Sequence, residues 1–211
     1  MTFFLSGCVT PTGSRSSMDI GPQLSSLFGQ EEEATIDPSK PKLDIVIPVF
    51  DPGLIDPDEV VIDKSTGKQK PQSTDENVWP ELRRAEANRF AYKLKLALEQ
   101  TGAFGAVRVT PDKTATGDLY LLGTIEESDG EDVQIEIAAY DISGARWFAK
   151  EFDHEVDEKY HDNYRNKDKD PYDPLFDEVA QYIVNELQYY EATELTATQR
   201  LTDLRFKSNF S

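Results

Sequence analysis

The sequence is poor in the residues that build disulfides, metal clusters and imidazole chemistry. Its 211 residues include one cysteine, Cys8, and two histidines, His154 and His161. One cysteine excludes an internal disulfide framework and any zinc or iron–sulfur site held by several cysteines. Two histidines leave little material for acid–base catalysis, and the sequence pairs no serine with either of them. These shortages weigh against most classes of enzyme.

Basic residues are also scarce. The chain has 22 Lys and Arg against 40 Asp and Glu, which gives a formal net charge of −18 at pH 7. Binding to phosphate needs clustered Lys and Arg, so nucleic acid is not expected as a partner. Docking on anionic lipid through surface charge is disfavoured for the same reason. The hydrophobic share, 38%, still exceeds that of a disordered chain, so a folded domain is expected.

Proline, glycine and serine divide the chain into segments. Residues 9–40 are rich in all three and predict a flexible linker. The folded domain is predicted at residues 41–190, with a long polar excursion at 51–78. Residues 191–211 are predicted to be a tail that stops as though cut, so the true end is expected beyond Ser211.

Hydrophobic periodicity predicts seven elements in the domain. Apolar residues at spacings of three and four predict helices at 80–101 and roughly 173–190. Short apolar or alternating runs predict five strands, at residues 43–50, 105–109, 119–125, 133–140 and 147–156. Pro48 predicts that the first strand is an edge strand or carries a bulge. Two helices on one face of a mainly antiparallel sheet of about five strands would bury these stripes, so the predicted class is α+β.

The most acidic part of the chain runs from Glu151, in the last predicted strand, to Glu178. There Asp168, Asp170 and Asp173 offer hard oxygen ligands to Ca²⁺, but the central glycine and closing glutamate of a calcium loop are absent. A solvated loop is therefore favoured, and Asp170 or Asp173 is also suited to cap the second helix. His154 opens a run like that of a zinc-protease helix, but Glu158 stands where the second histidine is required.

The first predicted helix has the opposite charge, with five Lys and Arg against three Glu. Such a face suits an anionic partner or the acidic loop of a second copy, although a solvated face with pairs inside the helix explains it as well. Trp79, just before the helix, is either a packing residue or a contact anchor. Trp79, Arg83 and Arg84 are therefore the candidate partner-binding residues.

The run Leu5-Ser6-Gly7-Cys8 resembles the lipobox of bacterial lipoprotein signal peptides. The resemblance implies cleavage before Cys8, a diacylglycerol on its sulfur and usually an amide-linked acyl chain such as palmitate; the alternative is an ordinary thiol near a frayed terminus. A basic segment and most of the apolar core are missing, so the true start is expected upstream of Met1. Val9 rather than Asp follows the cysteine, which in Gram-negative lipoproteins is compatible with export to the outer membrane.

Residues 41–190 show a second resemblance. It rests on three runs, which are Gln100-Thr101-Gly102-Ala103-Phe104, Gly117-Asp118-Leu119-Tyr120-Leu121-Leu122-Gly123-Thr124-Ile125 and Tyr140-Asp141-Ile142-Ser143-Gly144. They resemble the small α/β module of the TolB amino-terminal domain, of the curli-secretion lipoprotein CsgG and of the penicillin-binding-protein activator LpoB. The resemblance implies a periplasmic scaffold without catalytic residues. The loops at 51–78 and 157–171 depart from the pattern.

These observations together predict a non-enzymatic outer-membrane lipoprotein that faces the periplasm. Its α+β domain is expected to bind an envelope protein or a second copy, with no nucleic acid and no cofactor beyond the covalent lipid on Cys8. The alternative is a periplasmic or secreted enzyme, or a calcium-binding protein, that uses the acidic loop at 162–173.

Overall fold

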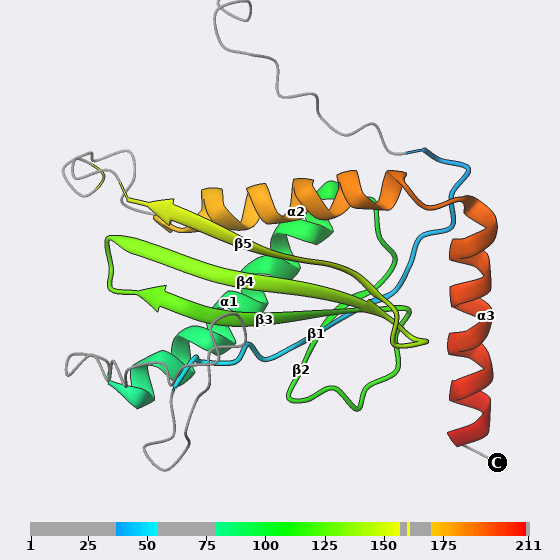
Figure 1. The fold of residues 1–211 in the computed structure, drawn as a ribbon, viewed down its shortest axis with the longest axis horizontal. Coiled ribbons are helices and arrows are strands. Elements are labelled where there is room, and N and C mark those ends of the chain that lie inside the picture. The colour runs from blue at the N-terminus through cyan, green and yellow to red at the C-terminus, as the bar shows by residue number, and fades with distance from the viewer. Residues whose placement is uncertain (1–36, 55–78, 157–159, 161–169, 210–211) are drawn as a thin grey trace, which may run out of the picture. The chain divides into compact units, whose positions relative to one another are not determined.

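Five strands and three helices make up the described part of the chain (Figure 1). The computed structural model describes residues 37–54, 79–156, 160 and 170–209, all within one unit, Ala34–Ser211. In chain order the elements are β1 (Ile45–Pro48), α1 (Pro80–Thr101), β2 (Val107–Thr110), β3 (Leu119–Ser128), β4 (Asp132–Asp141), β5 (Arg146–Glu155), α2 (Asp173–Gln188) and α3 (Ala192–Asn209). The predicted α+β class is confirmed.

The five strands form one mixed sheet in the order β2-β1-β3-β4-β5. β1 is parallel to both β2 and β3, whereas β3, β4 and β5 pair antiparallel. The prediction of a mainly antiparallel sheet is therefore wrong. A crossover that includes a helix, as between β1 and β2, makes strands parallel, while the tight turns on either side of β4 make hairpins.

Pro48 ends β1, which is an interior strand, so the prediction that it marks an edge is wrong. The alternative, a bulge, agrees with the one extra residue on the β1 side between the Val46–Tyr120 pair and the Asp51–Thr124 bridge. β1 pairs with β2 along its whole length, but with β3 only through Ile45 and Val46. The amide of Val49 donates to the carbonyl of Thr110, at 2.8 Å, beyond the end of β2's pairing with Pro48. Successive strand amides point to opposite sides, so the N–H that proline lacks falls on the β3 side, where pairing is interrupted between Val46 and Asp51.

α1 has the bounds that the sequence predicts. Pro80 occupies its first turn, where a missing N–H costs nothing. Gly102 ends it with a left-handed φ of 65°, and its amide donates to the carbonyl of Glu99 at 3.2 Å. A residue with a Cβ adopts that conformation reluctantly, so glycine fixes the end of the helix.

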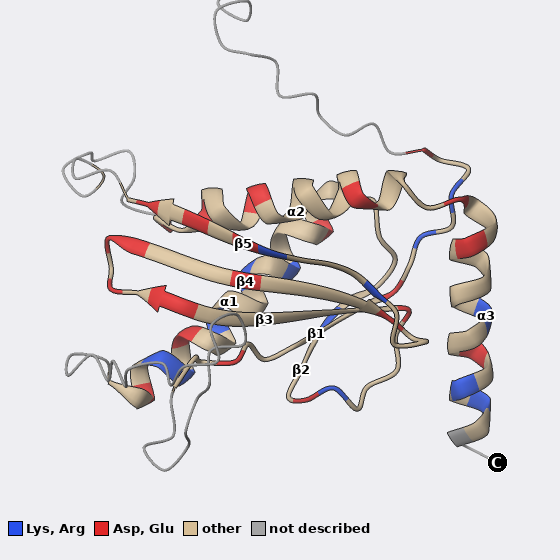
Figure 2. Ribbon diagram, viewed as in Figure 1, with Lys and Arg blue, Asp and Glu red and all other residues tan. Residues whose placement is uncertain are grey.

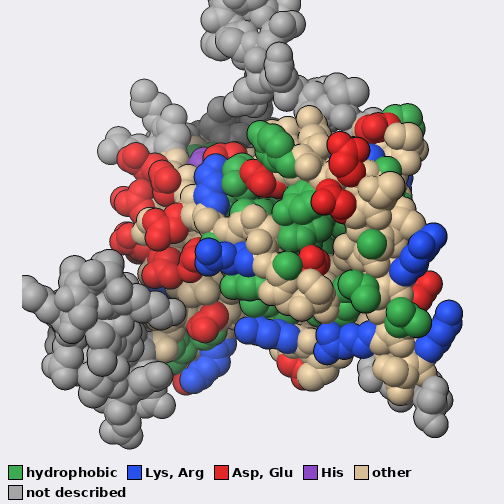
Figure 3. Space-filling view, turned by 45° about the vertical axis from the view of Figure 1, so that its right-hand side comes forward, with side chains coloured by type: hydrophobic (Ala, Val, Ile, Leu, Met, Phe, Trp, Pro, Cys, Tyr) green, Lys and Arg blue, Asp and Glu red, His purple; other side chains and the backbone are tan. Residues whose placement is uncertain are grey.

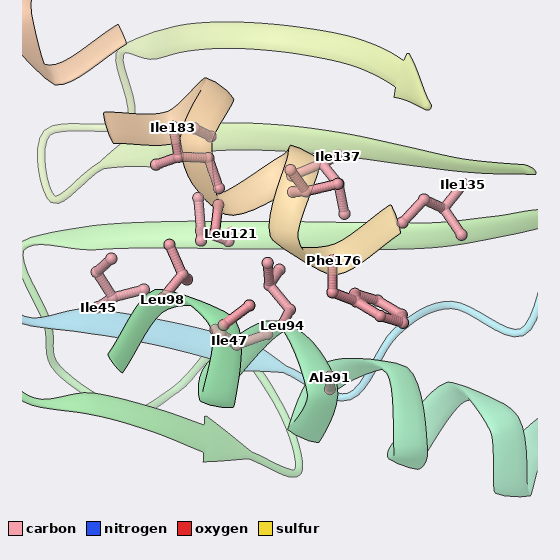
Figure 4. Close-up of a cluster of buried hydrophobic side chains, with 14 of the residues drawn as sticks. Ile45, Ile47, Ala91, Leu94, Leu98, Leu121, Ile135, Ile137, Phe176 and Ile183 are labelled. Atoms are coloured by element: carbon pink, nitrogen blue, oxygen red, sulfur yellow. The ribbon is translucent and has the colours of Figure 1, made fainter. Parts of the chain in front are cut away.

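α1 and α2 pack on the same face of the sheet and bury one continuous core (Figure 4). The core side chains labelled in the figure are Ile45, Ile47, Ala91, Leu94, Leu98, Leu121, Ile135, Ile137, Phe176 and Ile183. Between the two helices, the Phe90 ring lies edge-on to Phe176 and to Tyr172, with centroids 5.3 and 5.8 Å away. Fully burying one large apolar side chain contributes about 1.5–3 kcal/mol, so this layer carries most of the stability.

α3 occupies most of the segment predicted to be a tail, and the prediction of two helices is therefore wrong. It stands at the end of the sheet (Figure 1). Leu195 is fully buried, and Gln199 donates from Nε2 to the carbonyl of Lys42 at 2.9 Å. Only Leu195 and Thr198 of α3 are buried, so its sequence carries no full apolar stripe from which a helix would be recognised. Among the described helices, none is both long and apolar enough to cross a bilayer.

Candidate functional site

The beginning of α1 presents large apolar side chains to solvent. Trp79, at the position just before the helix, is 73% exposed, and Leu82 is 59% exposed. They are three residues apart, which makes them neighbours on the helix surface, and Arg84 is exposed in the same turn, on another side of the helix. The buried side of α1 bears Ala87, Phe90, Leu94 and Leu98 instead. Trp79, Leu82 and Arg84 are called the α1 surface below.

Arg83 does not belong to this surface. Its exposed fraction is 7%, and its Nε lies 3.7 Å from a carboxylate oxygen of Glu86. One of its terminal guanidinium nitrogens, Nη1, is buried and has no hydrogen-bond partner among the described residues. Arg83 lies four residues before Ala87, on the apolar stripe, and this spacing in the sequence already distinguishes it from Arg84.

The basic side of α1 meets the protein's own acidic segment. Asp170, just before α2, pairs with Arg89 and with Lys93, whose Nζ lies 3.0 Å from Asp170 Oδ2. The same ammonium group lies 2.6 Å from Oδ1 of Asp173. The sequence suggested an anionic partner or a second copy for this face. The structure shows an intramolecular contact that ties the start of α2 to the middle of α1.

Hydrogen bonds favour the ionised form of the Asp170 carboxyl group. Burial alone raises the pKa of this carboxyl, because its side chain is only 8% exposed. The backbone N–H of Tyr172, the ammonium of Lys93 and the guanidinium of Arg89 outweigh burial and hold the pKa below its usual value. Burial likewise lowers the pKa of Lys93, but its bonds to Asp173 and Asp170 raise it overall.

Of the three residues predicted to bind calcium, Asp168 lies outside the described residues. Asp170 and Asp173 are already engaged by cations of α1, and their oxygens also accept the backbone N–H groups of Tyr172 and Asp170, at 3.1 and 3.4 Å. Tyr172, rather than either carboxylate residue, occupies the N-cap position of α2. Within the described ranges no group of three or more potential ligands could hold a metal ion.

The remaining predicted residues divide between structural roles and undescribed parts of the chain. His154 bonds through Nε2 to the carbonyl of Pro171 at 3.2 Å, which fastens the end of β5 to the approach of α2. His161 and Cys8 lie outside the described residues. Trp147 stacks on Tyr190 with ring centroids 3.9 Å apart and is a packing residue, whereas Trp79 is largely exposed.

A small apolar hollow of about 120 Å³ lies between residues 37–42 and the end of α2. The lysines beside it cap helices. Lys40 donates from Nζ to the carbonyls of Leu187 and Gln188, at 3.3 and 2.9 Å, and Lys42 to that of Gly102, at 2.6 Å. Cations at helix carboxyl ends are favourable, so these two lysines stabilise the ends of α2 and α1.

A further surface, not foreseen from the sequence, is the sheet face away from α1 and α2. Acidic side chains gather there at one end of β3, β4 and β5 (Figures 2 and 3). By strand alternation and register, the acidic residues that face outward are Glu127, Asp132, Glu136, Glu151, Asp153 and Glu155. The alternation of acids with Phe152 in β5 is the sequence signal that could have revealed this surface.

No family model, curated protein or solved structure matches this chain. The resemblances to lipoproteins and to the TolB group therefore stay predictions.

Proposed function

We propose that this chain is a non-enzymatic envelope lipoprotein whose α+β domain binds another protein. In this proposal a lipid on Cys8 holds the chain at the outer membrane, and the domain faces the periplasm. The observation that carries the proposal is the α1 surface, where Trp79 and Leu82 are largely exposed and Arg84 is exposed in the same helical turn.

The α1 surface has the composition of a protein-binding hot spot. Tryptophan and arginine are enriched among residues that dominate binding energy, and a tryptophan buries about 150–250 Å² when covered. The core does not use the side chains of Trp79 and Leu82, since both are largely exposed at the start of α1. Exposing them in the unbound state is therefore unfavourable unless a partner covers them.

The surface is also presented by a fixed helix. The pairs of Asp170 with Arg89 and Lys93, together with the contact of Phe90 with Phe176, hold α1 against α2. A binding surface that is already ordered loses less conformational entropy when its partner arrives. Arg89 and Lys93 are occupied within the chain, so the proposed docking uses the exposed apolar side chains at the start of α1.

With a lipid anchor, even a weak interaction between the domain and its partner would be enough for binding. Residues 9–36, the part of the predicted linker that precedes the described residues, would span about 30 Å as a flexible coil. Confining the domain within that distance of the membrane raises its effective concentration for a partner in the same envelope. Burial of two or three acyl chains, at about 0.8 kcal/mol per CH₂, makes such an anchor effectively permanent.

Chemical cross-linking in the envelope of the native host tests the proposal. The Trp79→Ala/Leu82→Ala variant should lose at least about tenfold of the parent's cross-linked partner, because each hot-spot truncation costs more than about 1 kcal/mol. Leu201→Ala/Leu204→Ala, which truncates two exposed side chains of α3, is the matched control and should keep it. Both variants should keep the parent's melting temperature.

Two outcomes would count against the proposal. Equal recovery of partners by the parent and by Trp79→Ala/Leu82→Ala would remove the α1 surface as the docking site. A Cys8→Ser variant, expressed with its full upstream sequence, should leave the membrane fraction. If that variant stays membrane-bound, the lipid anchor is wrong even where docking is right.

A further inference from the structure

β5 is a long edge strand with one open side. It has ten residues, Arg146–Glu155, and pairs only with β4 in the sheet. Apart from that ladder, no backbone hydrogen bond of β5 is made within the described residues. An edge of this kind presents a row of N–H and C=O groups to any extended chain that can pair with it.

The outward side chains of β5 are acidic at alternate positions. Glu151, Asp153 and Glu155 are exposed, and none of them forms an ion pair within the described ranges. Across the ladder, Glu151 faces Glu136 of β4, and Glu155 faces Asp132. Like charges directly opposite one another destabilise a sheet, so these two acid pairs are unfavourable in the isolated domain.

We propose that the β5 edge binds a Lys- or Arg-rich extended segment of another protein as an added strand. In an extended chain, alternate residues are about 6.6 Å apart, which is also the spacing of Glu151, Asp153 and Glu155 along β5. Basic side chains at alternate positions of the incoming strand therefore meet the three carboxylates in turn. Main-chain hydrogen bonds supply affinity, and the alternating charges supply specificity.

The same charges exclude the other occupants of an open edge. A second copy would bring acids against acids, on a chain whose net charge is already −18. An uncharged strand would leave the acid pairs uncompensated, which is how charged residues protect an edge from indiscriminate pairing. The carboxylates of Glu151, Asp153 and Glu155, the acidic row, thus disfavour acidic and uncharged strands and attract a basic one. Repulsion and attraction both set the specificity.

This binding mode is independent of the α1 surface. α1 packs against β1, β2 and β3 on one face of the sheet, whereas the proposed site is the β5 edge with its acidic row on the other face. The domain would then hold two protein partners at once. A negative result for binding at one surface therefore does not count against binding at the other.

Binding of two labelled peptides to the full chain tests the proposal. One peptide alternates five Lys with five Thr, and the other has the same composition in the order Lys-Lys-Thr-Thr-Lys-Lys-Thr-Thr-Lys-Thr, in which no three successive positions on one face of a strand are all Lys. The alternating peptide should bind at least about fivefold more tightly, because only it can place a Lys opposite each acid of the row. The amides of β5 should also exchange hydrogen more slowly when it is bound.

A pair of charge variants separates the β5 edge from the general acidity of the chain. Glu151→Gln/Asp153→Asn should weaken the alternating peptide at least about fivefold without lowering the melting temperature, since it relieves repulsion with Glu136. Glu178→Gln/Asp203→Asn removes two charges from α2 and α3 and should change binding less than about twofold.

Four results would overturn the inference. They are no binding of either peptide, equal affinity for both, equal weakening by the two charge variants, and binding without slower exchange in β5. The second and third would show attraction by net charge alone, and the fourth would show binding elsewhere than at the strand edge.

Discussion

Asp170 shows how a residue with the chemistry of a ligand can have a structural role. Its side chain is nearly buried and joins Arg89 and Lys93 of α1 to the segment before α2. Arg89 is 49% exposed, so its pair with Asp170 is screened by water and contributes little. The bonds of the buried carboxylate to Lys93 and to the Tyr172 amide carry most of the contribution.

Replacing Asp170 by Asn should destabilise the domain by about 2 kcal/mol at pH 7, since hydrogen bonds to a charged group are lost. The folded pKa of this carboxyl is lowered, so its contribution is present above the unfolded value of about 3.9 and is lost as pH falls through the folded pKa. Urea unfolding at pH 7 and at pH 3 should therefore show a difference from the parent that shrinks in acid. Asp203→Asn, an exposed control, should stay within about 0.5 kcal/mol. A difference independent of pH would contradict this account.

Burial of individual residues was only partly predictable from the sequence. The spacing of Arg83 with Ala87 and Phe90 placed it on the apolar stripe, but its charge favoured the solvent side. The pairing of Asp170 with Arg89 joins positions 81 residues apart. No local sequence pattern predicts such a contact, because the contact depends on how α2 packs against α1.

At the scale of elements, local patterns located most helices and strands but not their partners. Alternation of Val133, Ile135 and Ile137 predicted a strand buried on one face, and the structure confirms it in β4. The parallel placement of β1 between β2 and β3 was missed, since the four residues of β1 carry no signal of direction. α3 was missed because its attachment rests on few side chains, chiefly Leu195.

The weak attachment of α3 predicts that it opens separately from the sheet. Its second half, residues 201–208, has no buried side chain, whereas α1 and α2 contribute seven buried residues each. Local opening costs least where few apolar contacts are broken. Hydrogen-exchange mass spectrometry should show faster exchange in residues 201–208 than in the centres of α1 and α2. Equal protection of all three helices would contradict the docking of α3 chiefly through its first half.

At the scale of the whole molecule, charge and exposed apolar surface are separated. The net charge of −18 opposes self-association and favours partners that bring positive charge. Acidic residues lie at one end of β3, β4 and β5, where the ribbon is red (Figure 2), whereas the exposed Trp79 and Leu82 lie at the start of α1. Such a separation fits a domain that contacts different partners with different surfaces, and the lipid anchor proposed at Cys8 would set where it meets them.

The most direct test of docking through the α1 surface compares oxidation of the two tryptophans by hydroxyl radicals in purified chain and in intact envelopes of the native host. Trp79 is 73% exposed, and Trp147, stacked on Tyr190, serves as the internal reference. The account predicts that Trp79 is oxidised several times more slowly in the envelope than in the purified chain, while the rate at Trp147 stays the same. Equal rates at Trp79 in both samples would contradict it.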